Sequence, residues 1–359
     1  MAERQQTAPR LQGMPHIVAI GGGTGLSTML RGLKKNTDAI TAIVSVADDG
    51  GGSGMLRQEL KMLPPGDIRS CILALAETEP MMEKLLRYRF ADGSLAGQSF
   101  GNLLLAAMNG IFCGDFVTAV KNVSEVLKVT GKVLPVTGCD VELVATLANG
   151  QTVVGESKIG CAVHDYGSAI SRIRLRPRAG GGEVLPVDDV LAEIAQADLI
   201  TLGPGSLYTS ILPNLAVSGV TEALAAAKAP IVYINNIMTQ PGETDGYTAF
   251  DHAEAILKHT RPHFIDYCIV NAAPVDTPLL SKYIEQDAET VILDMPRFAQ
   301  AGIQVIAKDL VSVEDGRYIR HNAAVLADVI MDLANKHRLG PNQVSEEGVV
   351  LYHPRHRRT

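Results

Sequence analysis

The chain has 359 residues, of which 46% are hydrophobic and 20% charged, and its net charge is −7. This length and apolar content allow a large core and argue against a disordered protein. The mild acidic balance predicts no general attraction to nucleic acid or anionic membranes, no apolar run is long enough to span a bilayer, and the polar N-terminus lacks a signal-peptide core. We therefore expect a cytoplasmic protein that binds no nucleic acid and does not insert into a membrane.

Short apolar segments alternate along the chain with longer amphipathic ones, which is the pattern of an α/β protein. Val, Ile and Leu dominate the short segments, as is typical of a parallel sheet covered on both faces. We expect strands at 16–20, 40–46, 132–137, 198–202, 230–235, 265–270 and 303–307. We expect helices at 25–35, 67–77, 79–89, 115–128, 187–196, 214–227 and 248–259. The predicted fold is Rossmann-like, with a doubly wound and mainly parallel sheet.

One stretch, 141–176, interrupts this alternation. Two β-rich runs flank Asn149-Gly150, a strong hairpin signal, so we expect a small antiparallel β insertion here. The second run alternates apolar residues with three arginines, so one face of the strand carries Arg172, Arg174 and Arg176. That face is either solvated or a basic rim for an anionic ligand. We expect one Rossmann-like domain over 15–338, a flexible tail at 1–14 and a C-terminal tail at 339–359.

The first expected strand ends in a glycine-rich turn, and a helix follows. Gly21 and Gly23 match two positions of a dinucleotide-binding fingerprint, but Leu26 occupies the third. The turn still combines glycine N–H groups with a helix N-terminus, which favours an anion. We interpret it as a phosphate-binding loop, the alternative being a turn that serves packing alone. Its candidate ligand-binding residues are Gly22, Gly23, Thr24, Gly25, Leu26 and Ser27.

A second glycine loop, with sequence VADDGGGSGMLR, follows the second expected strand. Neighbouring parallel strands carry their C-terminal loops to one crevice, where open α/β sheets bind ligands. Asp48 and Asp49 could hold ribose hydroxyls or hydrated Mg²⁺, whereas turn chemistry alone would also explain them. Asp67 also suits a helix cap. The candidates from this region are Asp48, Asp49, Gly50, Gly51, Ser53, Asp67, Arg69 and Asn102. Cysteine and histidine spacing predicts no zinc site, and no catalytic residue is assigned.

A third glycine loop repeats the strand–loop–helix pattern after residues 198–202, and it contains Gly203, Pro204, Gly205 and Ser206. The next strand runs into a polar segment, and polar loops at the C-terminal ends of strands commonly carry function. The candidates there are Asn235, Asn236, Thr239, Gln240, Glu243, Thr244 and Asp245. A loop without a ligand is the alternative interpretation.

The segments GGGTGLS, ADDGGGSGMLR, PPGDIR, GKVLPVT, GPGSLYTSILPNL and NNIMTQPGETDGY occur in this order. Together they closely resemble the bacterial gluconeogenesis-factor family, which is related to the 2-phospho-L-lactate transferases. The resemblance covers roughly residues 15–335 and implies a Rossmann-like fold, a cytoplasmic location and self-association, with a dimer expected. It implies that Asp48 and Asp49 match the acidic pair that the transferases use near metal and acceptor. One departure is Gly52, where the family pattern has Ser, so one hydroxyl donor is lost.

The resemblance implies binding of UDP-sugars such as UDP-N-acetylglucosamine, and links to carbon metabolism, cell shape and peptidoglycan synthesis. Our first hypothesis is therefore a nucleotide-sugar-binding regulator with a partner in cell-wall synthesis. The alternative is a Mg²⁺-dependent transferase that moves a phospholactyl group from a nucleotide-activated donor to a deazaflavin. Against it, aromatic residues are only 4% and Trp is absent, so no deazaflavin platform is evident. The hypothesis of an NAD(P)-dependent oxidoreductase rests only on the incomplete fingerprint.

Overall fold

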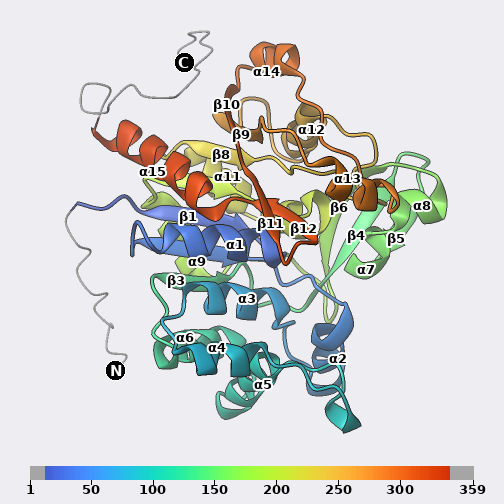
Figure 1. Ribbon diagram of the computed structural model, residues 1–359. Coiled ribbons are helices and arrows are strands. Elements are labelled where there is room, and N and C mark those ends of the chain that lie inside the picture. The colour runs from blue at the N-terminus through green and yellow to red at the C-terminus, as the bar shows by residue number, and fades with distance from the viewer. Residues whose placement is uncertain (1–12, 340–359) are drawn as a thin grey trace.

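The computed structural model describes residues 13–339, so most of both predicted tails lies outside the described residues (Figure 1). In this range a parallel sheet has the strand order β10-β9-β8-β7-β1-β2-β3. Its strands are β1 (Ile17–Gly21), β2 (Ile40–Val44), β3 (Lys132–Pro135), β7 (Leu199–Leu202), β8 (Ile231–Ile234), β9 (Tyr267–Asn271) and β10 (Gln304–Lys308). All the predicted strands are present, and the predicted doubly wound α/β fold is confirmed.

The strand order reverses between β1 and β7, because the chain builds the sheet outward from β1 toward β3 and then from β7 toward β10. The loops that follow β1 and β7 therefore leave the sheet side by side. A hydrogen bond of 2.8 Å from the Gly203 N–H to the Ile20 carbonyl joins the two strand ends. Ligands bind at such a switch point in open α/β sheets.

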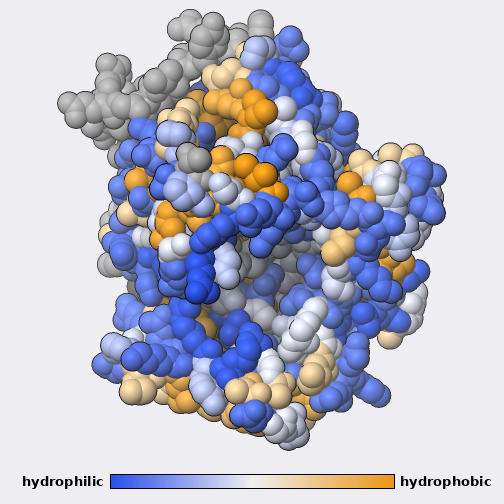
Figure 2. Space-filling view, turned by 45° about the vertical axis from the view of Figure 1, so that its right-hand side comes forward, coloured by the Kyte–Doolittle hydropathy of each residue, from blue (hydrophilic) through white to orange (hydrophobic). Residues whose placement is uncertain are grey.

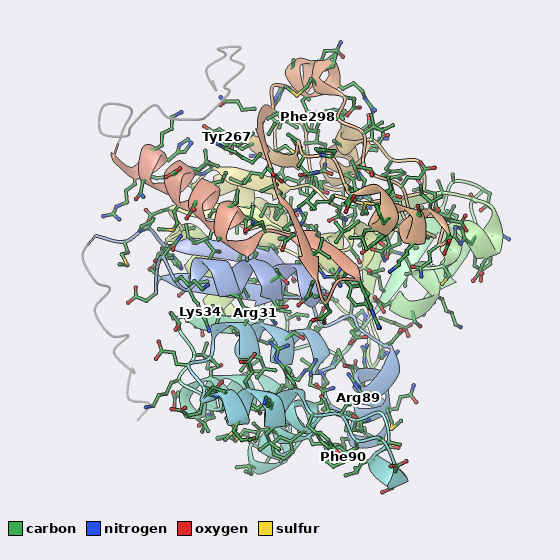
Figure 3. All side chains as sticks on the ribbon, in the orientation of Figure 1. Arg31, Lys34, Arg89, Phe90, Tyr267 and Phe298 are labelled. Carbon is green, nitrogen blue, oxygen red and sulfur yellow. The ribbon has the colours of Figure 1, made fainter. Side chains whose placement is uncertain are left out.

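Helices cover both faces of the sheet. Helices α1 (Gly23–Leu33), α3 (Gly66–Leu75) and α15 (Ala323–Leu339) pack together in front of the sheet in Figure 1, and α9 (Asp188–Ala195) and α11 (Val220–Ala226) lie behind it. Helix α1 crosses α15 at Gly32, where a Cβ atom would collide with the carbonyl group of Ala323. The Lys34 Nζ donates to the Ala76 carbonyl at 2.9 Å, which ties the end of α1 to the end of α3 (Figure 3).

The remaining helices partly differ from prediction. They include α2 (Gly51–Leu60), α4 (Pro80–Arg87), α5 (Phe100–Ile111), α6 (Phe116–Val126), α12 (Ala249–His259), α13 (Thr277–Ile284) and α14 (Met295–Ala301). The prediction of a single helix over 214–227 is wrong. A π-helical turn, η2 (Leu207–Ile211), runs into α10 (Leu212–Leu215), and Gly219 with a φ of +81° separates α10 from α11. The second glycine loop is also shorter than predicted, because α2 begins at Gly51.

The predicted antiparallel insertion is confirmed as a sheet of β4 (Val141–Leu147), β5 (Thr152–Val154) and β6 (Ile170–Pro177), with short helices α7 (Glu156–Ile159) and α8 (Ala162–Tyr166). The β4–β5 hairpin turns at Asn149-Gly150, as the sequence predicts. The three arginines of β6 are exposed, and Arg176 pairs with Glu142 on the neighbouring strand. These contacts fit a solvated face.

A hairpin of β11 (Val311–Glu314) and β12 (Tyr318–His321) was not predicted. Its turn contains Asp315 and Gly316, both with positive φ, and the Asp-Gly pair is a hairpin signal that the sequence does contain. The hairpin lies beside α1, so it reaches the region of the first glycine loop (Figure 1).

The surface seen in Figure 2 is mostly hydrophilic, with scattered apolar residues and a hollow near its middle. The apolar side chains of β1 are fully buried and form the centre of a continuous core between sheet and helices. No helix between residues 13 and 339 combines the length and apolar character needed to cross a bilayer.

Candidate functional site

The glycine loops after β1 and β7 pack against each other backbone to backbone. A Cβ on Gly25 would lie 2.7 Å from the Pro204 carbonyl oxygen, and one on Gly205 would lie 3.1 Å from the Gly22 carbonyl oxygen. Gly203 has a φ of +81°, which side chains disfavour. The sequence therefore uses glycine here because any side chain would separate the two loops.

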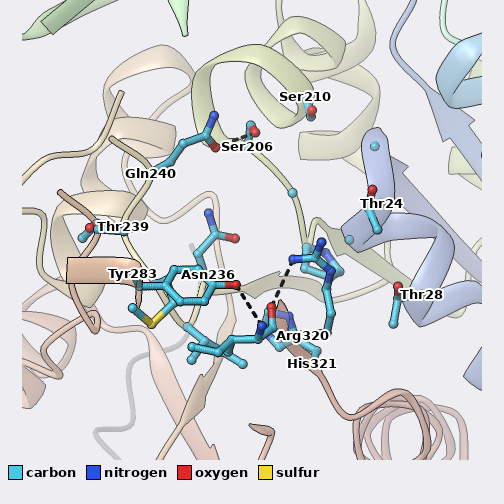
Figure 4. Close-up of a pocket in the computed structure, with 18 of the residues that line it drawn as sticks. Thr24, Thr28, Ser206, Ser210, Asn236, Thr239, Gln240, Tyr283, Arg320 and His321 are labelled. Carbon is cyan, nitrogen blue, oxygen red and sulfur yellow. Dashed lines mark hydrogen bonds between the residues drawn. The ribbon is translucent and has the colours of Figure 1, made fainter. Parts of the chain in front are cut away.

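A pocket of about 410 Å³ opens beside these loops (Figure 4). Thr24 and Thr28 of α1 lie on one side of it, and Thr239, Gln240 and Tyr283 lie on the other. The pocket is lined by residues 22–25, Thr28, 204–206, Ser210, 236–241, Tyr283, Gln286, Ala288 and 319–321. Segments from both halves of the sheet and from the β11–β12 hairpin thus meet in one cavity.

Hydrogen bonds hold two walls of this pocket. The Ser206 hydroxyl donates to the Gln240 side-chain oxygen at 2.6 Å. On the hairpin side, the Ile319 N–H donates to the Tyr283 hydroxyl at 2.8 Å, and the Arg320 Nη1 donates to the Ile319 carbonyl at 3.1 Å (Figure 4). Arg320 lines the cavity, and its Nε lies 3.5 Å from a Glu314 carboxylate oxygen, so its positive charge is partly balanced by that ion pair.

Many of the predicted site residues share this pocket. The structure brings together there Gly22, Gly23, Thr24, Gly25, Pro204, Gly205, Ser206, Asn236, Thr239 and Gln240. In the sequence they are spread over more than two hundred positions, from Gly22 to Gln240, and the parallel sheet unites them at the ends of β1, β7 and β8.

Leu26 and Ser27 do not line the pocket. Leu26 is fully buried in the core, because the fourth residue of α1 lies on the face that packs on the sheet. Ser27 is 2% exposed, and its hydroxyl donates to the Thr24 carbonyl at 2.9 Å. The expectation that both contact a ligand directly is therefore not supported by their positions.

Part of the polar segment after β8 also points away from the pocket. The Asn235 amide is buried and donates to the Ala249 carbonyl at 2.7 Å. Thr244 is fully buried, and its hydroxyl accepts the Gln240 N–H at 2.9 Å. Asp245 contacts His164 at 3.0 Å on α8. These residues shape the loop, whereas Asn236, Thr239 and Gln240 face the cavity.

Glu243 lies beneath the pocket wall and is 1% exposed. Its carboxylate accepts hydrogen bonds from the Gln240 side chain, the Thr209 hydroxyl and the Tyr208 N–H. Burial raises the pKa of Glu243 to about 7, although the Thr209 and Tyr208 hydrogen bonds act in the opposite direction. It reaches the pocket only through Gln240.

Carboxylates gather on the other side of the first glycine loop. A Cβ on Gly22 would lie 2.5 Å from an Asp67 carboxylate oxygen, and the Gly23 N–H donates to the same carboxylate. Burial, followed by the charge of Asp48, raises the pKa of Asp67 to about 6. Asp48 accepts the Gly50 N–H at 2.9 Å, a turn contact.

Asp49 has a structural partner. Its carboxylate accepts the N–H groups of Glu156 at 3.0 Å and Ser157 at 2.9 Å, at the start of α7. Burial, with the charges of Asp48 and Asp49, raises the pKa of Glu156 to about 8. In the described part of the chain, no group of three or more His, Cys, Asp or Glu side chains is arranged to hold a metal ion.

The other predicted residues of the second region lie outside the pocket. Gly51 is exposed at the start of α2, and Ser53 is buried against Gly66. Arg69 is partly buried and donates to the Ser70 hydroxyl at 3.3 Å. The buried Asn102 donates its N–H to the cap residue of α5.

Sequence reasoning missed several pocket residues, namely Thr28, Ser210, Tyr283, Gln286, Arg320 and His321. Thr28 lies one helical turn after Thr24, so helix periodicity was a usable signal. Arg320 and His321 lie on the unpredicted hairpin. His321 donates to the Asn235 carbonyl at 2.9 Å, and burial lowers its pKa to about 4. This contact ties the hairpin to the end of β8.

The fold and the paired glycine loops define an α/β protein with a pocket at the switch point of its sheet, and comparison with known proteins identifies its family. Residues 17–311 match the family described as 2-phospho-L-lactate transferase CofD. A relative from Thermoanaerobacterium thermosulfurigenes is 56% identical over 319 residues, which cover 89% of this chain and 97% of that protein. The Bacillus subtilis protein named gluconeogenesis factor is 46% identical over 320 residues, covering 89% and 98%.

A crystal structure of a protein from Bacillus halodurans has a TM-score of 0.83 with 45% identity, and the match covers 88% of this chain and 99% of that one. The chain therefore belongs to the gluconeogenesis-factor branch of the CofD family.

Proposed function

We propose that the pocket binds the diphosphate of a nucleotide sugar of the UDP-N-acetylglucosamine type, and that the protein acts as a cytoplasmic regulator linked to carbon metabolism and peptidoglycan synthesis. The observation that carries this proposal is the meeting of two glycine loops at the switch point of the sheet, on the wall of a 410 Å³ pocket. Ligand pockets of about 300–1,000 Å³ are typical of small-molecule sites.

The diphosphate would lie against the start of α1. The first N–H groups of a helix have no carbonyl acceptor one turn earlier in the chain. The N–H groups of Thr24 and Gly25 are therefore suited to donate to a phosphate oxygen. The Gly23 N–H already binds Asp67, so it is engaged elsewhere. The guanidinium of Arg320 lines the same cavity, and although its Nε is 3.5 Å from Glu314, its other nitrogens could donate to a doubly charged group.

The rest of the ligand would lie against the opposite wall. Asn236, Thr239 and Gln240 supply polar side chains, and Tyr283 supplies an aromatic ring. Polar groups that fix orientation beside one aromatic surface suit a nucleoside or a sugar ring.

Thermal unfolding with separate samples of UDP-N-acetylglucosamine, GDP plus Mg²⁺, and NADH tests this proposal. A ligand at about a hundred times its dissociation constant adds about 2.7 kcal/mol, which moves the midpoint by a few degrees. We expect a shift with the UDP-sugar. No shift with it at millimolar concentration would contradict the proposal, and a shift with NADH alone would favour an oxidoreductase.

The second candidate function is a Mg²⁺-dependent transferase of the type that names the family. Mg²⁺ usually binds one or two carboxylates together with substrate phosphates. Asp48 and Asp67 offer such carboxylates beside the first glycine loop, whereas Asp49 is occupied by the start of α7. The ion would supply charge neutralisation at the phosphate. Turnover of a guanylyl-activated phospholactate with a deazaflavin and Mg²⁺ would support this candidate.

A further inference from the structure

The buried carboxylate of Glu243 is surrounded by hydrogen-bond donors. The Gln240 Nε2 lies 2.6 Å from Oε1, the Thr209 hydroxyl lies 3.1 Å from the same oxygen, and the Tyr208 N–H lies 3.3 Å from Oε2. An ionised carboxylate only accepts hydrogen bonds, so it satisfies all these neighbours together. No uncharged side chain of similar size has two terminal oxygen atoms that both act only as hydrogen-bond acceptors.

This arrangement fixes the direction of the Gln240 amide. Its nitrogen must face Glu243, because the amide oxygen would be repelled by a carboxylate. The amide oxygen consequently faces the other way, where it accepts the Ser206 hydroxyl at 2.6 Å on the pocket wall (Figure 4). A carbonyl oxygen has a second lone pair, so it can accept one more hydrogen bond from a molecule in the pocket.

We propose that Glu243 is a positioning residue that holds the amide oxygen of Gln240 toward the pocket, so that the pocket selects a ligand whose group at this point donates a hydrogen bond. This inference rests on the proposed function and deepens it. UDP-N-acetylglucosamine carries three kinds of donor, namely the imide N–H of uracil, the hydroxyls of its two sugars and the acetamido N–H. A cytosine ring lacks the imide N–H, so the first kind would also discriminate between the two bases.

Other charged groups near Glu243 decide the conditions for a test. Asp245 adds negative charge, and Tyr208 and Thr209 contribute the donors that favour the ionised form. Glu156 lies near enough to feel the charge of Glu243, but its own pKa is raised to about 8, so it is itself only partly ionised near that pH. Since burial raises the pKa of Glu243 to about 7, the carboxylate is predominantly ionised about one pH unit above that value. Binding is therefore measured at about one pH unit above the pKa of Glu243, where the ionised carboxylate holds the Gln240 amide in one direction.

A double-mutant cycle with calorimetry of UDP-N-acetylglucosamine tests the proposal. We expect Glu243→Gln to weaken binding about tenfold, the size of one lost hydrogen bond, when Gln240 is present. We expect less than about a twofold effect in the Gln240→Ala background, because Glu243 acts through that side chain. A merely structural role would cost the same affinity in both backgrounds, and this outcome would overturn the proposal.

The base and the sugars are separated as sources of the donor with UDP-N-acetylglucosamine and with the same ligand methylated on the imide nitrogen. If the base donates, methylation weakens binding to the wild type about tenfold but leaves binding to Glu243→Gln unchanged. If a hydroxyl or the acetamido N–H donates, methylation has no effect and the loss caused by Glu243→Gln persists with the methylated ligand. Both outcomes support the proposal, and an equal loss of pyrophosphate binding in Glu243→Gln would overturn it.

A measurement without ligand keeps this inference separate from the proposed function. In protein labelled with ¹⁵N-glutamine, the side-chain signal absent from Gln240→Ala identifies Gln240. We expect slow exchange of this amide with solvent in the wild type and faster exchange in Glu243→Gln. Identical exchange in both proteins would overturn the inference. Absence of UDP-sugar binding to the wild type would instead refute the proposed function, while the labelled amide still decides the direction of Gln240.

Discussion

Replacing Gly25 by alanine tests the close contact between the two glycine loops. The new Cβ would lie 2.7 Å from the oxygen and 2.9 Å from the carbon of the Pro204 carbonyl, and 3.2 Å from the Gly205 nitrogen, whereas ordinary contact is 3.4–4 Å. All these neighbours are backbone atoms, so they cannot rotate away as a flexible side chain would. The loops must separate by several tenths of an ångström, and overpacking of this kind costs about 1–3 kcal/mol.

Urea unfolding should show this loss. Calorimetry should show weaker UDP-N-acetylglucosamine binding by about tenfold or more, because the N–H groups that we propose to bind the phosphates move. Gly110→Ala is the matched control, since Gly110 is an exposed residue of α5 with nothing within 4 Å of its Cβ position. That change should stabilise the protein by about 0.5–1 kcal/mol through helix propensity. If Gly25→Ala retained wild-type stability and affinity, the close contact between the loops would be refuted.

Three further predictions concern other parts of the molecule. Arg320→Ala should weaken UDP-sugar binding about tenfold in calorimetry. Arg317→Ala changes an exposed residue of the same hairpin and should leave binding unchanged. Equal effects of the two substitutions would show that Arg320 does not contact the ligand. Glu156 has a folded-state pKa of about 8 against 4.5 unfolded, so the unfolding free energy should fall as pH rises through that interval. Glu156→Gln should flatten this fall in urea titrations, and an unchanged slope would contradict the assignment. Gly32→Ala should cost about 1–3 kcal/mol in the same assay, because its Cβ would collide with Ala323, and unchanged stability would contradict that packing.

The sheet was predictable because buried parallel strands are short, continuous runs of Val, Ile and Leu between glycine-rich turns. Once β1 and β7 are placed as parallel strands, their loops must share one edge, so Gly25 and Gly205 could be brought together from the sequence. The split of the helix predicted at 214–227 was harder to predict. Apolar residues lie on both sides of residues 216–219, and the turn that these residues form, with a positive φ at Gly219, separates α10 from α11.

The site was predicted less completely because side-chain direction depends on tertiary packing. Leu26 follows a glycine loop but faces the core, and the polar Glu243 turns inward to neighbours that come from a distant segment. Arg320 lies on a hairpin whose Asp315-Gly316 signal is present in the sequence. Yet the packing of that hairpin beside α1 depends on contacts across nearly the whole described chain, which no local pattern reports.

The pocket takes one wall from residues 22–28 and another from residues 319–321. During synthesis the glycine loop of α1 leaves the ribosome early, whereas Arg320 is added close to the end of the described range. A nascent chain therefore carries the first glycine loop without the opposite wall of the pocket, and contacts between such distant segments form late in folding. Under the proposed function, a nucleotide sugar therefore meets both walls of the pocket only on chains that have been synthesised past residue 321 and have folded.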